Sequence, residues 1–298
     1  MQDFRTQTFL SVCNTMNYTR SSHELNITQP AVSQHIAYME KEYGTKLFDY
    51  QKRKLKLTDA GVMLRDALTV AKHNERGLKD RIASLSDERR TLNLGVTMTA
   101  GQYVLARPLA RYLVEEPSIQ TSLVASDTER LLKLLQKDVI DCALVEGFFN
   151  KSQYGWELFS TEELILVHAP EHRFAQKPSQ FEDLLGEHLL IREEGSGSRA
   201  VLENELAAHN LSPSSFARLT EISSPNIIKA FIEHDYGISF LYRAAVKKEL
   251  AEKRLSVLTL SNTPIKHDMT FIWLKGSLFE DEMRALVTQL RENYHTGT

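Results

Sequence analysis

The sequence has few cysteines and lacks long apolar runs. Cys13 and Cys142 are its only cysteines, and each lies inside an apolar pattern, so the sequence predicts neither a disulfide framework nor a cysteine metal site. No stretch of about 18 apolar residues occurs, and the amino end has no basic segment followed by an apolar run. Secretion and membrane spanning are therefore not expected, and the low cysteine content fits a reducing, cytoplasmic setting.

Signatures of catalysis are also missing. No Gly-x-Ser-x-Gly turn occurs, so a hydrolase would lack its nucleophile. Residues 195–200 spell the dinucleotide pattern Gly-x-Gly-x-x-Ala, but three charged residues, 192–194, separate it from the preceding apolar strand. Pairs of residues that could suggest a metal or catalytic site have no third ligand beside them: His168 with His172, His234 with Asp235, and His267 with Asp268. We therefore predict no enzyme, no metal site and no cofactor.

The composition is that of an ordinary globular protein with an uneven distribution of charge. A chain of 298 residues suggests about two domains, and 42% hydrophobic with 25% charged residues is typical of such chains. The formal net charge is −3, but residues 1–58 carry eight Lys or Arg and five Asp or Glu, a net +3, which leaves −6 for residues 59–298. A polyanion would therefore meet the amino-terminal segment first.

A helix is predicted to begin at Thr28, which can cap it, with Pro30 in its first turn. Apolar residues recur at intervals of four and three and predict one buried stripe: Val32, Ile36, Met39 and Tyr43. The opposite side is polar: Gln29, Ser33 and His35, with Gln34 at its edge. Short polar side chains in the first two turns of an exposed helix are what reading base edges in a major groove requires. An ordinary amphipathic surface helix would show the same pattern.

The neighbouring segments favour the DNA-reading interpretation. Residues 3–16 and 20–25 read as two further helices, the second capped by Thr19, which gives the order of a helix-turn-helix. Residues 46–57 then alternate as a small hairpin would. Its basic tip, Lys52 to Lys54, would lie along phosphates or enter a minor groove, although a solvated charge run is the commoner meaning of such a cluster on its own.

Taken together, residues 4–61 resemble the LysR-type transcriptional regulators. The resemblance rests on Ile-Thr-Gln-Pro-Ala-Val-Ser-Gln-His-Ile at 27–36, the following Met-Glu-x-x-Tyr-Gly-x-Lys-Leu-Phe, the basic wing and Leu-Thr-Asp-Ala-Gly at 57–61. It implies a winged helix-turn-helix over residues 1–58 that binds double-stranded promoter DNA. The implied base contacts are Gln29, Pro30, Ser33 and Gln34, with Arg53 in the wing and backbone contacts from Thr28 and Lys52. The family often has Arg where Gln34 and Tyr50 stand here, so contacts made by those arginines are not carried over.

Residues 59–90 are expected to form a linker helix followed by a hinge at 87–90. The segment to about residue 86 has no proline and one glycine, and Thr58 or Asp59 can cap it. Its apolar residues form a narrow seam: Leu64, Ala67, Ala71, Leu78, Ile82 and Leu85. Such a seam suggests pairing with a second copy of the chain. The resemblance also implies a homodimer through this helix, and a homotetramer as the common family assembly.

Residues 91–298 alternate strand and helix patterns, which predicts an α/β domain with a mostly parallel sheet covered on both faces. Strand crossings expected near 161–163 and 264–268 would divide it into lobe I, residues 91–161 and 268–298, and lobe II, residues 162–267. The arrangement resembles the two-lobed, periplasmic-binding-protein-like effector domain of the same family. The expected fold class is therefore α/β, with a winged helix-turn-helix, a long linker helix and a two-lobed effector domain.

Ligands in such folds bind at the carboxyl ends of strands, between the lobes. Two loop-to-helix junctions are candidates for an effector site, together with a floor between them: Thr97, Thr99, Ala100 and Gly101; Gly195, Ser196, Gly197, Ser198 and Arg199; and Glu146 with Gly147. Small residues and helix N–H groups there suggest an anionic small molecule. The alternative is that the glycines only make a tight turn and the threonines only cap helices.

The expected function is therefore regulation of transcription, with an effector that alters promoter contacts and no membrane partner. The competing class is an enzyme or solute receptor built on residues 91–298. It would need a signal peptide or a catalytic constellation, and the sequence has neither.

Overall fold

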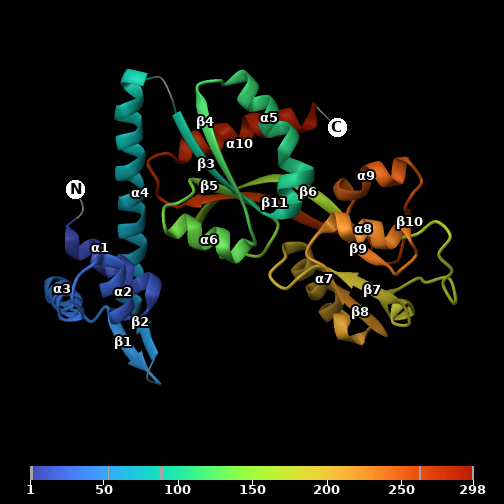
Figure 1. The fold of residues 1–298 in the computed structure, drawn as a ribbon, viewed down its shortest axis with the longest axis horizontal. Helices are drawn as coiled ribbons and strands as arrows, with labels where there is room; N and C mark the ends of the chain where they lie inside the picture. Colours follow the sequence, from blue (N-terminus) through green and yellow to red (C-terminus); the bar gives the residue numbers. More distant parts are fainter. Residues whose placement is uncertain (1–2, 53, 88–89, 262, 297–298) are drawn as a thin grey trace. The chain divides into compact units, whose positions relative to one another are not determined.

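The computed structural model describes residues 3–52, 54–87, 90–261 and 263–296, and divides into two compact units (Figure 1). Unit 1 comprises Met1–Glu88 with Gly276–Phe279, and unit 2 comprises Arg89–Lys275 with Glu280–Thr298. Among the helices of these described ranges, none is both long and apolar enough to cross a membrane.

Unit 1 contains three short helices, a hairpin and one long helix. In chain order these are α1 Phe4–Thr15, α2 Tyr18–Leu25, α3 Gln29–Glu42, β1 Phe48–Gln51, β2 Lys54–Leu57 and α4 Asp59–Asp87. The two strands pair antiparallel from Phe48 opposite Leu57 to Gln51 opposite Lys54. The predicted helices, hairpin and long helix are thus confirmed, and their apolar faces share one core around Phe9, Val12 and Val32.

The helix caps follow the sequence with one exception. Thr28 caps α3, because its hydroxyl accepts from the Ala31 N–H at 3.3 Å. Thr58 does the same for Gly61 at 3.0 Å at the start of α4. The prediction of Thr19 as the cap of α2 is wrong: the helix begins one residue earlier, at Tyr18, and the Asn17 side chain accepts from the Arg20 N–H at 2.9 Å.

The predicted buried stripe of α3 holds for Val32, Ile36 and Met39, which are at most 3% exposed. Tyr43, in contrast, is 52% exposed. Helix α3 ends at Glu42, so Tyr43 is the cap residue before the turn at Gly44 and no longer follows the helical period. His35 also departs from its predicted place on the free polar side, since its Nδ1 lies 2.9 Å from the Thr8 hydroxyl of α1.

The seam of α4 is exposed along most of its described length. Ala67, Ala71, Leu78 and Ile82 are exposed, and Met63 joins them. Leu64 instead packs against the core of the three short helices. The Leu85 side chain and hinge residues 88–89 lie outside the described parts. The long helix therefore presents an apolar stripe that the rest of unit 1 does not cover.

Unit 2 is built on one large sheet and one small sheet. The large sheet has the order β10-β6-β11-β5-β3-β4, with β9 also paired to β6; the small sheet pairs β7 with β8. The strand bounds are β3 Arg90–Val96, β4 Ile119–Ala125, β5 Cys142–Val145, β6 Tyr154–His168, β7 His188–Ile191, β8 Arg218–Glu221, β9 Ser239–Tyr242, β10 Ser256–Leu258 and β11 Ile265–Leu274.

The expectation of a mostly parallel sheet is only partly right. Strands β4, β3 and β5 are parallel, and so are β7 and β8. The two long strands β6 and β11 run antiparallel to each other, from Ile265 opposite Leu164 to Leu274 opposite Tyr154. They cover both predicted crossing points, and a chain that leaves along one strand and returns along its neighbour must pair antiparallel.

Helices and further strands gather around the two ends of β6 (Figure 1). The first half of unit 2 holds β3, β4, β5 and most of β11, with the π-helical turn η1 Ala100–Leu105 and helices α5 Ala106–Glu115, α6 Thr128–Gln136 and α10 Glu280–His295. The second half holds β7 to β10, with α7 Gly197–Ala208, α8 Pro225–Glu233, α9 Arg243–Ala251 and the short 3-10 turns η2 Phe181–Leu184 and η3 Pro213–Ser215. One apolar core includes residues of both halves, among them Leu94, Phe159 and Leu189.

Candidate functional site

The start of α3 presents polar side chains to solvent. Thr28, Gln29, Pro30 and Gln34 are exposed and Ser33 is half-buried. The Gln29 amide donates to the Ser33 hydroxyl at 2.9 Å, so the two side chains form one hydrogen-bonding edge. Because the other face of α3 is anchored in the core, this edge is held rigidly outward. It offers donors and acceptors of the type that recognise base edges.

The hairpin places positive charge beside its turn. Lys52 is exposed and has a left-handed backbone, with φ of 49°, as a tight turn requires. Along β2, Lys54 and Lys56 are exposed while Leu55 and Leu57 pack against the core. Arg53 lies outside the described residues. The alternation turns the lysines of this strand outward, where they can meet phosphates.

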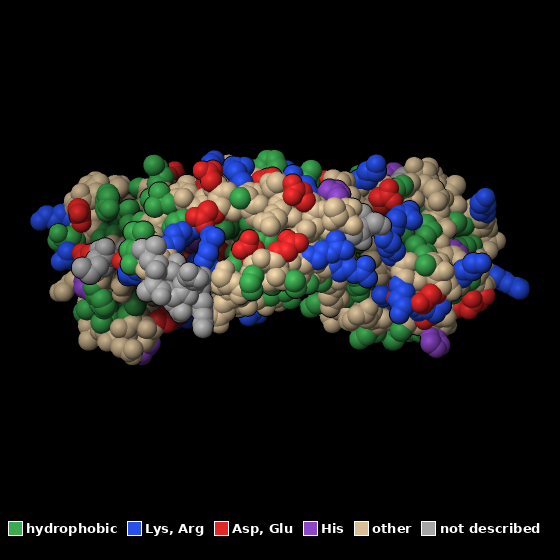
Figure 2. Space-filling view, turned by 90° about the horizontal axis from the view of Figure 1, so that it is seen from above, with side chains coloured by type: hydrophobic (Ala, Val, Ile, Leu, Met, Phe, Trp, Pro, Cys, Tyr) green, Lys and Arg blue, Asp and Glu red, His purple; other side chains and the backbone are tan. Residues whose placement is uncertain are grey.

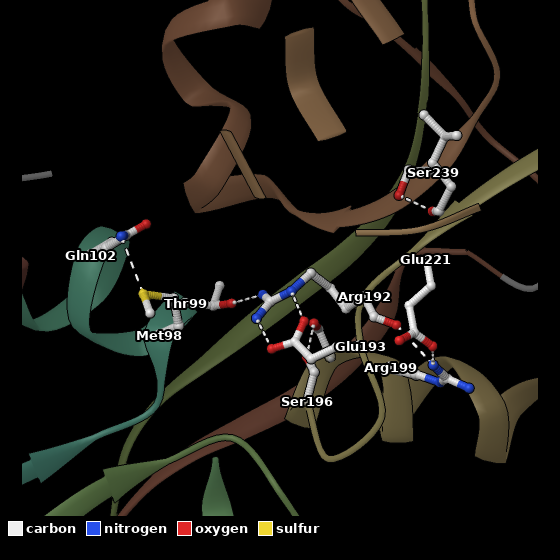
Figure 3. Close-up of polar contacts among 11 residues, drawn as sticks. Met98, Thr99, Gln102, Arg192, Glu193, Ser196, Arg199, Glu221 and Ser239 are labelled. Atoms are coloured by element: carbon white, nitrogen blue, oxygen red, sulfur yellow. Dashed lines mark hydrogen bonds and ion pairs between the residues drawn. The ribbon is translucent and has the colours of Figure 1, made fainter. Parts of the chain in front are cut away.

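In unit 2, side chains from the two halves meet at a buried cluster that we call the polar junction: Thr97, Thr99, Glu146, Arg192, Ser196 and Ser198. Each is at most 5% exposed. The Arg192 Nη1 donates to the Thr99 hydroxyl at 3.2 Å, and its Nε and Nη2 donate to Glu193 at 2.8 and 2.9 Å (Figure 3). Ser196 and Ser198 lie with their hydroxyls 3.1 Å apart. The junction therefore joins the loop after β3 to the loop after β7.

Glu146 lies at the centre of this junction. Burial raises the pKa of its carboxyl to about 7, although Arg192 and hydrogen bonds from the Ser198 N–H and the Thr99 hydroxyl favour the charged form. The Glu146 carboxyl therefore lies at the start of α7, where a ligand anion was predicted. Its Oε2 is buried without a hydrogen-bond partner among the described residues. A hydrogen-bond donor on a ligand could pair with this oxygen.

Arg199 contacts this cluster only through the Arg192 backbone. Its guanidinium donates to Glu203 at 2.7 Å, to Glu221 at 2.6 Å and to the Arg192 carbonyl at 3.0 Å. Figure 3 shows it beside Glu221, on the far side of Arg192 from Thr99. Two carboxylates already neutralise its charge, which weighs against a direct role for Arg199 in holding an anion.

The remaining predicted residues shape the backbone. Ala100 is fully buried in η1, and a side chain at Gly101 or Gly147 would meet Val96 or Thr128 respectively. Gly195 has φ of +88°, which only glycine adopts readily, and so makes the turn before α7. A Cβ at Gly197 would lie 2.2 Å from the Glu146 Cγ. These small residues let the two loops approach each other.

Three residues of this region were not predicted from the sequence. Arg192 follows β7 directly, and its place at the carboxyl end of a strand was the signal that could have found it. Thr128 and Tyr242 have hydroxyls that are buried and unpartnered in the described structure, as is that of the predicted Thr97. Both residues lie close to the predicted floor, because Thr128 contacts Gly147 and Tyr242 is influenced by the charge of Glu146. Nothing in their own sequence neighbourhoods marked them.

Other chemistries find little support in unit 1 or unit 2. Within the described ranges, no group of three or more His, Cys, Asp or Glu side chains is arranged to hold a metal ion. Cys13 and Cys142 are buried as free thiols, and burial raises the pKa of both. Neither thiol is poised as a nucleophile.

Comparisons with known proteins agree with this division of the chain. Residues 5–62 match the family model "Bacterial regulatory helix-turn-helix protein, lysR family", and residues 86–294 match the model "LysR substrate binding domain". The transcriptional regulator CbbR of Rhodospirillum rubrum is 30% identical, over 96% of this chain and 94% of its own. The transcriptional regulator CysL of Bacillus subtilis is 27% identical, over 97% of each chain.

A solved structure supports the same fold over nearly the whole length. Full-length LysG from Corynebacterium glutamicum, with its bound effector Arg, has a TM-score of 0.68 and 15% identity, and the match covers 99% of each chain. The two family models together span most of this sequence. The chain therefore belongs to the LysR family of bacterial transcriptional regulators, with the family's DNA-binding domain at its amino end and an effector-binding domain after it.

Proposed function

We propose that this regulator reads promoter DNA with the start of α3, and that a small acid bound at the polar junction changes those contacts. The observation that carries the DNA-reading part is the exposed edge of Gln29 and Ser33 on a helix whose opposite face is buried. Pro30 and Gln34 would complete the base contacts. The DNA backbone on either side of these base contacts would be held by Thr28, Lys52 and Arg53.

The test of DNA reading is a salt-controlled gel shift on the DNA flanking the regulator's own gene. A Gln29→Ala, Ser33→Ala double variant should lose most of its preference for the specific fragment while keeping its non-specific affinity, since each good base contact contributes roughly 1–3 kcal/mol. Gln120→Ala, an exposed glutamine on β4, is the matched control. Unchanged preference in the double variant would refute this assignment.

For the effector we propose a small molecule that carries both an acid group and a hydrogen-bond donor. Thr97, Thr128, Tyr242 and Glu146 have buried polar atoms without partners among the described residues, and such atoms are costly unless a ligand or water satisfies them. A donor would reach Glu146, and the acid group would be held near Arg192 and Ser196. Since Glu146 itself occupies the start of α7, an acid is accepted more readily when Glu146 is protonated.

The effector proposal predicts a pH dependence that separates it from simple charge attraction. Thermal-shift measurements with a panel of hydroxy acids, amino acids, dicarboxylates and their amides should find an acid that stabilises the protein more at about pH 6 than at about pH 8. The matching amide should bind more weakly. An amide that binds as well as its acid would overturn the anionic part of the proposal.

We also propose that two copies pair through the exposed stripe of α4, and that pairs associate further into a tetramer in the cytoplasm. The stripe of Ala67, Ala71, Leu78 and Ile82 supports the first step. An effector that changes how the proposed lobes, residues 91–161 with 268–298 and residues 162–267, sit against each other would then change the spacing of the DNA-reading heads.

A further inference from the structure

Unit 2 has a second candidate binding site, on the side of β6 that carries α5, α9 and α10. A pocket of about 820 Å³ lies there, with walls from η1 and α5 in the first half and from α8 and α9 in the second. Its lining includes six cationic side chains: Arg107, Arg111, Lys229, Arg243, Lys247 and Lys248. None of the predicted effector residues lines it. We call it the basic pocket.

The acidic side chains of the basic pocket already have partners. Glu249 accepts from Lys229 at 2.8 Å, and Glu163 accepts from Arg243 at 2.8 Å. Glu162 accepts from the Tyr294 hydroxyl at 2.8 Å. The three carboxylates are therefore committed, and they neutralise at most three of the six cations.

The remaining cations are left facing one space. In the described parts of the chain, Arg107 and Lys247 have no acidic partner, and Arg111 donates only to the Asn293 carbonyl and the Thr296 hydroxyl. Lys248 has only a long contact of 3.9 Å with Glu252. Arg107 and Arg111 are one turn apart on α5, as Arg243 and Lys247 are on α9, so two rows of like charge border one hollow.

These side chains concentrate positive charge at one place on a protein whose net charge is negative. Figure 2 looks onto the face of unit 2 that carries α5, α9 and α10 and shows Lys and Arg side chains gathered there. We propose that the basic pocket binds a small polyanion with at least two phosphate or carboxylate groups. The volume matches a metabolite rather than a single phosphate ion.

The position of the pocket suggests what its ligand would do. Arg107 and Arg111 belong to the first half of unit 2, while Lys247 and Lys248 belong to the second. A polyanion that bridges them would hold the two halves at one angle. The site would therefore add a second input to the regulator, separate from the polar junction.

The test uses the full-length protein without DNA, titrated calorimetrically with inorganic tripolyphosphate and with citrate at about 50 mM salt. At least one probe should bind at one site per chain. An Arg107→Gln, Lys247→Gln double variant should bind it about tenfold or more weakly, and Arg111→Gln should be weakened less. Since all three side chains are exposed, the variants should keep the wild-type circular dichroism spectrum.

The matched control is a Lys137→Gln, Lys177→Gln double variant, which removes the same charge from exposed positions outside the pocket. It should bind the probe within about twofold of the wild type. An equal loss in both double variants would show diffuse charge attraction and overturn the site. So would binding of neither probe, or a change of oligomeric state in the pocket variant with unchanged binding, which would assign the cations to a second copy of the chain.

Discussion

Glu146 carries a carboxyl group that the fold has almost removed from water. Its pKa in the folded protein is about 7, against an ordinary value of 4.5. Between these values the folded protein holds a proton that the unfolded chain releases, so this group's contribution to stability is lost as the pH rises through that window. The loss amounts to roughly 3 kcal/mol at most.

Replacing this residue should therefore flatten the pH profile. We expect Glu146→Gln to gain stability relative to the wild type as the pH rises from about 5 to about 8, because glutamine has no proton to lose. Thermal denaturation of both proteins across this range measures the difference, in which the other titrating groups cancel. A constant difference would show that the wild-type carboxyl does not titrate in this window.

Gly197 allows Glu146 to approach the start of α7. We expect Gly197→Ala to lower the free energy of unfolding by about 1–3 kcal/mol, because its Cβ would lie 2.2 Å from the Glu146 Cγ. Gly186→Ala is the matched control, since nothing lies within 4 Å of its added Cβ. Urea unfolding of the two variants compares them. Equal effects would mean that the close approach at Gly197 relaxes without cost.

Single residues differ in how far the sequence could predict them. The cap at Thr28 and the burial of Val32 follow from local rules, because each depends on neighbours within one or two turns. The roles of Arg192 and Arg199 do not. Both follow the same strand region, and only the fold decides that Arg192 meets Thr99 while Arg199 meets Glu221.

The hairpin β1–β2 should act on DNA differently from α3. Lys52 lies at its turn, and we propose that it contacts the DNA backbone, so Lys52→Gln should weaken binding to specific and random DNA by similar factors. The slope of log affinity against log salt should fall by about 1. Filter binding at several salt concentrations measures this, with Lys177→Gln in unit 2 as control. A loss confined to the specific fragment would mean that Lys52 reads bases.

Helices and strands could be predicted from the sequence where they depend on a short, local pattern of residues. The alternation of apolar and basic residues at 54–57 gave the hairpin strand, and the absence of proline gave α4. The helical segment after β3, in contrast, opens with the π-helical turn η1, and the sheet is mixed because β6 and β11 pair over long range. Neither feature leaves a periodic signature in the sequence.

In our proposal, the assembly of the protein depends on the uncovered stripe of α4. A charge at Leu78, which is 51% exposed, would be buried in the proposed pair, so Leu78→Glu should weaken self-association by about a hundredfold or more. Lys72→Glu, a larger change of charge at an exposed position off the stripe, should have little effect. Sedimentation velocity over a range of concentrations compares them. Equal weakening by both variants would point to another interface.

The polar junction has one further consequence for signalling. The Glu146 carboxyl already accepts a hydrogen bond from the Ser198 N–H at the start of α7, the place where we propose that the effector's acid group binds. In the effector site that we propose, an incoming acid would have to displace this carboxylate, which is part of the chain and therefore always present. On this proposal, acidification of the cell interior would protonate Glu146 and weaken its competition, so the concentration of metabolite needed for a response should drop as the cell becomes more acid.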